Sequence, residues 1–251
     1  MKILDFFRDS KLNEKLKDKR KAECPYCNKS LVKIPGSKTK CPHCGKFMFV
    51  RTRPKDDVRV ITTESEADKI DEGWSIVNDN HDYFIAEKEK YIKEKEILKN
   101  RFGKEEPSEN DIKWGLYNKG LIEHATNGDW GLYRNIKFQM GEILRKEAKL
   151  KDALRTYLEV CYLDLNGPNN TGRINDPEFQ REFPPFDPTE GNSFIAPGVI
   201  DRIQKIIKKL EPEKKTVETN FIKHNSRIQQ SLKLPVTPII CWNKLENKIW
   251  K

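Results

Sequence analysis

The chain has 251 residues and a formal net charge of +9, and 35% of its residues are charged against 36% that are hydrophobic. This balance excludes a thick buried sheet and favours thin layers of helices with much solvated surface. No apolar run reaches the roughly 20 residues that span a bilayer, and charged residues follow Met1 too closely for a signal peptide, so we expect a soluble, cytoplasmic protein that has no membrane partner.

The charge is distributed unevenly along the chain. Residues 1–60 contain 17 Lys and Arg against 7 Asp and Glu, residues 61–196 contain 19 against 27, and residues 197–251 contain 12 against 5. Basic ends around an acidic middle indicate that the ends bind nucleic acid or an acidic protein. The alternative is that the ends fold back on the middle of the same chain. The pattern begins in residues 1–21, where we expect a basic amphipathic helix.

The cysteines give the most specific signal in the sequence. Four of the six form two Cys-x2-Cys pairs separated by 13 residues: Cys24 with Cys27, and Cys41 with Cys44. Two such turns can place four sulfurs around one zinc ion. Pro35 and Gly36 lie midway and predict a turn between two strands, while Gly45 permits a positive φ after the last cysteine. Two disulfides or four free thiols are the alternative, although no secretion signal supports the oxidising compartment that disulfides need.

The stretch from about residue 22 to residue 53 resembles the zinc-ribbon family. The resemblance implies a small β fold and a ligand role for Cys24, Cys27, Cys41 and Cys44. Four cysteinates leave no open coordination position, so we expect one structural Zn²⁺ that folds the segment and performs no chemistry. A further strand and a short helix opening at a capping box near Thr63 extend this module over residues 22–78.

Basic residues frame and fill the expected ribbon, with aromatic residues between them. Charges that neutralise phosphates and rings that stack on bases are typical of a DNA or RNA interface. Docking to a protein is the alternative use of the same surface. The candidate contact residues are Lys29, Lys33, Lys38, Lys40, Lys46, Arg51 and Arg53.

Residues 79–165 have the apolar spacing of amphipathic helices, beginning with Phe84, Tyr91 and Leu98 at intervals of seven. Within residues 130–165, small and large residues alternate as in a tetratricopeptide unit: Gly141, Leu144, Ala153, Tyr157 and Val160. This segment therefore resembles one tetratricopeptide hairpin, and the resemblance implies a protein-binding body. No second copy follows at a spacing of 34 residues, and an ordinary helical bundle is the alternative.

The last third of the chain combines a loop with further helices. Residues 166–196 are rich in Pro, Gly and Asn but hold four Phe, which predicts an ordered loop packed on the helices. In residues 197–251, Pro197 opens a helix, a second helix runs to about Leu232, and a basic tail follows. We expect the tail to dock as an irregular or strand-like segment or to bind a partner. Cys161 is expected to be buried and apolar in character, and Cys241 is assigned no chemistry.

These features predict a mainly α protein with a small N-terminal β zinc ribbon and a helical-hairpin, tetratricopeptide-like body. The favoured function is a non-enzymatic zinc-binding adaptor whose helical body binds a protein partner. The first alternative is a nucleic-acid-binding factor that uses the basic ribbon face and the basic ends. The second is a divergent enzyme with a site at loop 166–196.

Overall fold

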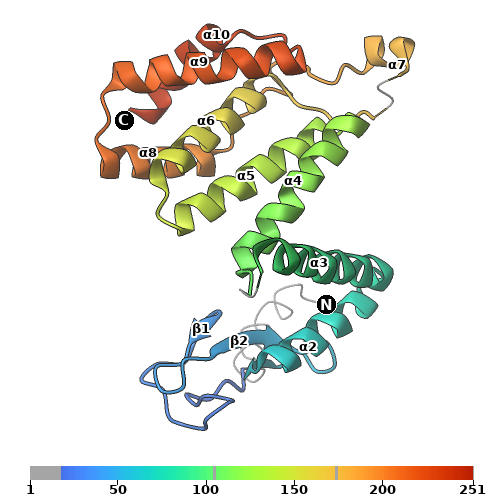
Figure 1. Ribbon diagram of the computed structural model, residues 1–251, viewed down its shortest axis with the longest axis vertical. Helices are drawn as coiled ribbons and strands as arrows, with labels where there is room; N and C mark the ends of the chain where they lie inside the picture. The colour runs from blue at the N-terminus through green and yellow to red at the C-terminus, as the bar shows by residue number, and fades with distance from the viewer. Residues whose placement is uncertain (1–17, 104–105, 173–174, 251) are drawn as a thin grey trace, which may run out of the picture. The chain divides into compact units, whose positions relative to one another are not determined.

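The computed structural model describes residues 18–103, 106–172 and 175–250. These residues hold one three-stranded sheet and nine α-helices, which confirms the expected mainly α fold with a small N-terminal β part (Figure 1). The chain divides into two compact units, one ending at Ile92 and one beginning at Lys93, so the division falls inside helix α3 (His81–Phe102). The expected helix over residues 1–21 lies outside the described residues except for 18–21, where Asp18 bridges to Arg59.

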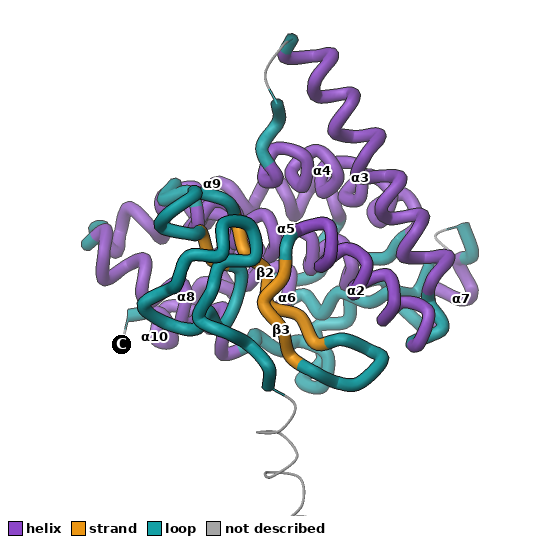
Figure 2. Tube along the Cα trace, turned by 90° about the horizontal axis from the view of Figure 1, so that it is seen from below, coloured by secondary structure: helices purple, strands orange, loops and turns teal. Residues whose placement is uncertain are grey.

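The sheet of the first unit is antiparallel, in the order β1 (Thr39–Lys40), β2 (Phe47–Thr52) and β3 (Arg59–Thr62). Figure 2 shows β2 and β3 side by side, and their register places Val50 opposite Ile61. Strand β2 buries Met48 and Phe49, whereas Phe47 is exposed. The strand lies at the centre of the sheet and carries two of the buried side chains of this unit.

Helix α2 (Glu64–Val77) covers the sheet and begins at the expected capping box, in which Thr63 and Glu66 exchange hydrogen bonds. Its side chains hold it to β2: the Trp74 indole donates to the Thr52 carbonyl at 2.6 Å, and Arg51 pairs with Asp71 at 2.7 Å. The helix is therefore tied to the sheet by polar contacts at two successive turns.

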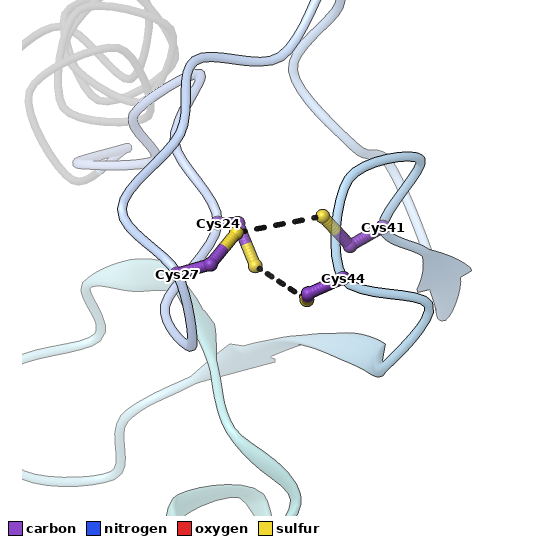
Figure 3. Close-up of side chains that lie close together, drawn as sticks. All are labelled: Cys24, Cys27, Cys41 and Cys44. Carbon is purple, nitrogen blue, oxygen red and sulfur yellow. Dashed lines mark hydrogen bonds between the residues drawn. The ribbon is translucent and has the colours of Figure 1, made fainter.

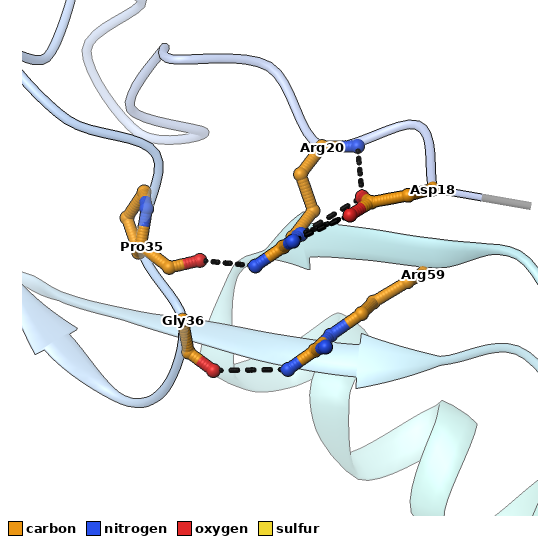
Figure 4. A network of polar contacts seen from close by, with 5 residues as sticks. All are labelled: Asp18, Arg20, Pro35, Gly36 and Arg59. Carbon is orange, nitrogen blue, oxygen red and sulfur yellow. Dashed lines mark hydrogen bonds and ion pairs between the residues drawn. The ribbon is translucent and has the colours of Figure 1, made fainter. Parts of the chain in front are cut away.

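The segment between the two cysteine pairs differs from the expected hairpin. Pro35 and Gly36 do not join two strands; their carbonyls instead accept hydrogen bonds from Arg20 at 2.9 Å and Arg59 at 3.0 Å (Figure 4). The hairpin that does form is β1–β2, and the second cysteine pair is its turn. The expected turn between two strands was therefore wrong, and the two carbonyls are satisfied by arginine side chains 15 and 23 residues away.

The second unit consists of helices joined by mostly short connections. They are α4 (Glu109–Asn127), α5 (Trp130–Lys146), α6 (Leu150–Leu165), α7 (Pro177–Glu182), α8 (Pro197–Leu210), α9 (Lys214–Leu232) and α10 (Pro238–Ile249). Helix α4 opens at a capping box of Ser108 and Asp111 and ends at Gly128, whose φ is +78°. Among the described residues, no helix has the length and apolarity that crossing a membrane requires.

Helix α6 is at the centre of this unit and packs against α5, α8, α9 and α10. Tyr157, Val160 and Tyr162 are completely buried. The pair α5–α6 approaches closely at Gly141, where an added Cβ would lie 2.8 Å from the Tyr157 ring. The small residue expected at this position therefore does allow the two helices of the hairpin to meet.

The described part of loop 166–196 includes the short helix α7 and is tied to the other helices by hydrogen bonds. Asn169 accepts a hydrogen bond from the Trp130 amide at 2.9 Å, and the Asn170 side chain accepts from the Leu132 amide at 3.0 Å. The loop thus caps the start of α5, a helix whose own N-cap residue provides no side-chain hydrogen bond. Phe186 is buried against Trp130 with ring centroids 5.1 Å apart, whereas Phe183 and Phe194 are exposed.

The C-terminal tail is neither irregular nor strand-like: it forms helix α10 and docks on the core. Trp242 is 1% exposed, and its ring lies 5.2 Å from that of Phe221. The buried residues Cys241, Leu245 and Ile249 recur every fourth position, and Pro238 occupies the first turn. Both are helix signals, so the expectation of an irregular or strand-like segment was wrong.

Candidate metal centre

The four cysteines of the two Cys-x2-Cys pairs converge in the first unit. Their sulfurs all lie within 4.8 Å of one another (Figure 3). The Sγ atoms of Cys24 and Cys44 are 3.7 Å apart, and those of Cys27 and Cys41 are 3.9 Å apart. Sulfurs bound tetrahedrally to zinc at 2.3 Å are separated by about 3.8 Å, so the spacing fits a single ion.

Both cysteine pairs adopt the same backbone turn. In the first, the Asn28 amide donates to the Cys24 carbonyl at 2.9 Å; in the second, the Gly45 amide donates to the Cys41 carbonyl at 3.0 Å. The residue after each second cysteine is left-handed, with φ of +55° at Asn28 and +73° at Gly45. Gly45 was anticipated from the sequence and Asn28 was not, although Asn is the commonest non-glycine residue in this conformation.

Burial and backbone amides give the thiols different acidities. Burial raises the pKa of Cys41, but hydrogen bonds from the Cys44 and His43 amides outweigh it and lower that pKa to about 6. At Cys27 the Lys29 amide lowers the pKa, yet burial and the three neighbouring thiols raise it to about 11. Because cysteine binds a metal as the thiolate, metal binding at this site would release protons and depend on pH.

The surroundings suit a structural ion. Cys24 and Cys41 are buried with Met48, and Tyr26, Leu31 and Ile61 pack against them. Four thiolates complete a tetrahedral shell and leave no position for water or substrate. His43 is exposed as expected, and its Nε2 lies 3.0 Å from the Ser30 carbonyl. The donor set fits zinc in a role that stabilises the fold.

The seven candidate nucleic-acid contacts fall into two groups. The lysines are exposed: Lys29, Lys33, Lys38, Lys40 and Lys46. The ammonium of Lys38 lies 5.1 Å from the centroid of Phe47. By contrast, Arg51 and Arg53 are half-buried and pair with Asp71 at 2.7 Å and Asp56 at 2.6 Å. Both arginines therefore form ion pairs within the chain, whereas the five lysines are at the surface.

The two remaining cysteines lie in the core of the second unit and are fully buried. Burial raises the pKa of Cys161 far above its usual range and raises the pKa of Cys241 to about 12. Both thiols are protonated at neutral pH, as expected for residues that serve as small apolar side chains.

Comparison with known proteins adds no relative to these observations: the chain matches no protein-family model, no curated protein and no solved structure. The resemblance to zinc ribbons therefore rests on the cysteine spacing and the clustered sulfurs beside a β-hairpin. The resemblance to a tetratricopeptide hairpin rests on the spacing of small and large residues in α5 and α6.

Proposed function

We propose that the protein is a non-enzymatic adaptor in which one zinc ion folds the first unit and the helical second unit binds a protein partner. The convergence of four sulfurs within 4.8 Å carries this proposal. A Cys₄ set is closed to substrate, so the ion holds the fold together and does no chemistry. The first unit is small, and the binding energy of zinc compensates for its limited buried core.

Elemental analysis of the purified full-length chain tests the metal. We expect one zinc per chain, less than one after Cys24→Ser or Cys44→Ser, and one again in the matched variant His43→Ala. His43 is the control because it lies inside the second pair and has a ligand-type side chain, yet its ring contacts the Ser30 carbonyl. Zinc loss in His43→Ala, or wild-type protein without zinc, would contradict the proposal.

Affinity capture with the full-length chain tests the adaptor function. The bait is incubated with nuclease-treated extract, and a captured protein is then purified and titrated against the chain by calorimetry. We expect saturable binding of a defined partner that survives nuclease treatment. Capture that disappears after nuclease treatment would favour the second candidate below.

Nucleic-acid binding is the second candidate, and the charge of one segment favours it. From Cys24 to Arg53 the chain has seven basic residues and no Asp or Glu. The five lysines are exposed, and Phe47 remains 49% exposed beside Lys38. Ammonium groups neutralise phosphates and an exposed ring stacks on a base, so this surface has both components of single-strand binding.

A salt series with labelled single-stranded RNA and DNA distinguishes this candidate. If it holds, log affinity falls linearly with log salt concentration, and each phosphate contact removed lowers the slope by about 0.7. Lys33→Glu, Lys40→Glu and Lys46→Glu together should flatten the slope. The matched control reverses three exposed lysines outside the basic ends: Lys88 and Lys93 of α3 and Lys146 of α5. Equal slopes in the two triple variants would exclude the ribbon lysines as the binding surface.

A further inference from the structure

The second unit contains a pocket of about 710 Å³ between α6, the end of α8 and α9. Its volume lies within the range of roughly 300–1,000 Å³ typical of sites that bind small ligands or a short anchor. Apart from one amide, the buried part of its lining is apolar: Leu154 and Leu158 of α6 and Val217 and Phe221 of α9. An occupant therefore needs a large apolar group.

The charged part of the lining is predominantly basic. Four basic residues line the pocket, Lys151, Arg155, Lys223 and Arg227, against the two acidic residues Asp152 and Glu213. Both acidic groups are engaged locally: Asp152 pairs with Arg155 at 2.9 Å, and Glu213 accepts from Thr216 at 3.0 Å. Within the described part of the chain, no ion pair involves Lys151, Lys223 or Arg227, and all three are exposed.

A third acidic residue near the pocket does not cancel this charge. Glu159 is buried on α6 and meets the pocket-lining His224 at 3.1 Å, but Lys137 also pairs with it at 2.8 Å. The ammonium of Lys137 therefore neutralises the carboxylate of Glu159. Lys223 and Arg227, one turn apart on α9, are thus left to attract an anion.

The pocket is also lined by a buried amide that lacks one hydrogen bond. Asn225 is 1% exposed, and its Nδ2 donates to the Phe221 carbonyl at 2.9 Å. Its Oδ1 has no donor among the described residues. An unsatisfied buried acceptor destabilises a fold unless a donor reaches it, and a peptide N–H is such a donor.

We propose that this pocket binds an acidic peptide segment of the protein partner. A large apolar side chain of the peptide fills the buried lining, and an adjacent carboxylate pairs with Lys223 and Arg227. A peptide supplies the apolar group, the anion and the N–H together, whereas a phosphate or nucleic-acid strand has no large aliphatic group for the lining. The inference rests on the adaptor function proposed above and gives its partner a chemistry and a docking surface.

Selection from a displayed library of random twelve-residue peptides on the full-length chain tests this. We expect enrichment of Asp or Glu next to Leu, Ile, Phe or Trp. Calorimetry should show that the enriched peptides bind the Lys223→Glu, Arg227→Glu double variant with an affinity about tenfold or more weaker than that for the wild type. Their affinity for the wild type should also fall as the salt concentration rises. Replacing the peptide's acidic residues by lysine should restore binding to that variant. The matched control, Lys244→Glu with Lys248→Glu on α10, should bind as the wild type does.

Enrichment of basic or uncharged peptides, or equal affinity in the Lys223→Glu, Arg227→Glu variant, would overturn the proposal. The two proposals fail in different ways. If that variant captures the same partner from nuclease-treated extract as the wild type does, the adaptor function stands and the pocket is not its docking surface. If acidic peptides bind at the pocket while no partner is captured, the pocket assignment stands and the adaptor function fails.

Discussion

At the residue scale, the backbones of two residues outside the cysteine set shape the candidate metal centre. Asn28 and Gly45 each follow the second cysteine of a pair, and each adopts a left-handed backbone whose amide closes the turn onto a cysteine carbonyl. With these backbone turns in place, the two sulfurs of each pair lie within 4.8 Å of the sulfurs of the other pair. Ligand geometry therefore depends on backbone conformation one residue beyond the ligands.

Gly45→Ala tests this dependence. An added Cβ would have its nearest neighbour 3.9 Å away at Lys40, so space is available and only the φ of +73° opposes the change. A left-handed backbone costs a residue with a Cβ about 1–2 kcal/mol, which corresponds to a zinc affinity about five- to thirtyfold weaker. Competition with a chromophoric chelator measures the affinity. Asn28→Gly is the control and should bind zinc at least as tightly as the wild type; unchanged affinity in Gly45→Ala would refute the backbone argument.

At the element scale, one carboxylate joins three helices of the second unit. Glu142 on α5 accepts a hydrogen bond from the Tyr157 hydroxyl on α6 at 2.5 Å and another from Arg202 on α8. Arg145, one turn along α5, donates at 2.8 Å. Burial raises the pKa of Glu142, but these donors outweigh it and lower the pKa to about 2. The negative charge of Glu142 is therefore part of what holds α5, α6 and α8 together.

The low pKa of Glu142 predicts a pH-dependent stability. Because the folded pKa lies below the unfolded value, the contribution is complete at neutral pH and is lost as pH falls from about 4.5 through about 2. This linkage is worth up to roughly 3 kcal/mol. Urea unfolding followed by tryptophan fluorescence should show Glu142→Gln less stable than the wild type at pH 7, with the gap closing toward pH 2. A gap that stays constant with pH would mean that Glu142 contributes through shape and not through charge.

At the scale of the whole molecule, each unit has its own core. The core of the first includes Cys24, Cys41 and Met48, so two of the four clustered cysteines are themselves core residues. The core of the second is built from α5, α6, α8, α9 and α10 and contains no metal ligand. Loss of zinc should consequently affect the two units differently.

Hydrogen–deuterium exchange of the full-length Cys24→Ser variant tests this division. We expect amide protection to disappear in β1, β2 and β3 and to persist in α5, α6 and α8, with most of the far-ultraviolet circular dichroism retained. Chelation of zinc from the wild type should produce the same pattern. Loss of protection throughout α6 would show that the two units unfold as one.

The features that could be predicted from sequence are those encoded by neighbouring residues. The Cys-x2-Cys spacing identified the four cysteines whose sulfurs cluster, and the capping box at Thr63 located the start of α2 because the donor and acceptor lie three residues apart. Helix α10 was encoded just as locally, by buried apolar residues at every fourth position, yet the tail was expected to be irregular or strand-like.

Features that depend on distant partners were beyond prediction from one sequence. Nothing near Pro35 indicates that Arg20 binds its carbonyl, and nothing in α6 or α9 alone indicates that they enclose a pocket with α8. The candidate nucleic-acid contacts show the same limit of prediction from sequence. Arg51 resembled the lysines in sequence, yet its partner Asp71 lies 20 residues away in α2.

The capping of α5 by loop 166–196 has a consequence for synthesis of the chain. The Leu132 amide depends on Asn170, which is 38 residues further along. As the polypeptide leaves the ribosome, α5 emerges well before the residue that completes its first turn, and that turn stays frayed until translation passes position 170. A nascent chain stalled before this point would carry an α5 whose first turn lacks the hydrogen bonds to Asn169 and Asn170.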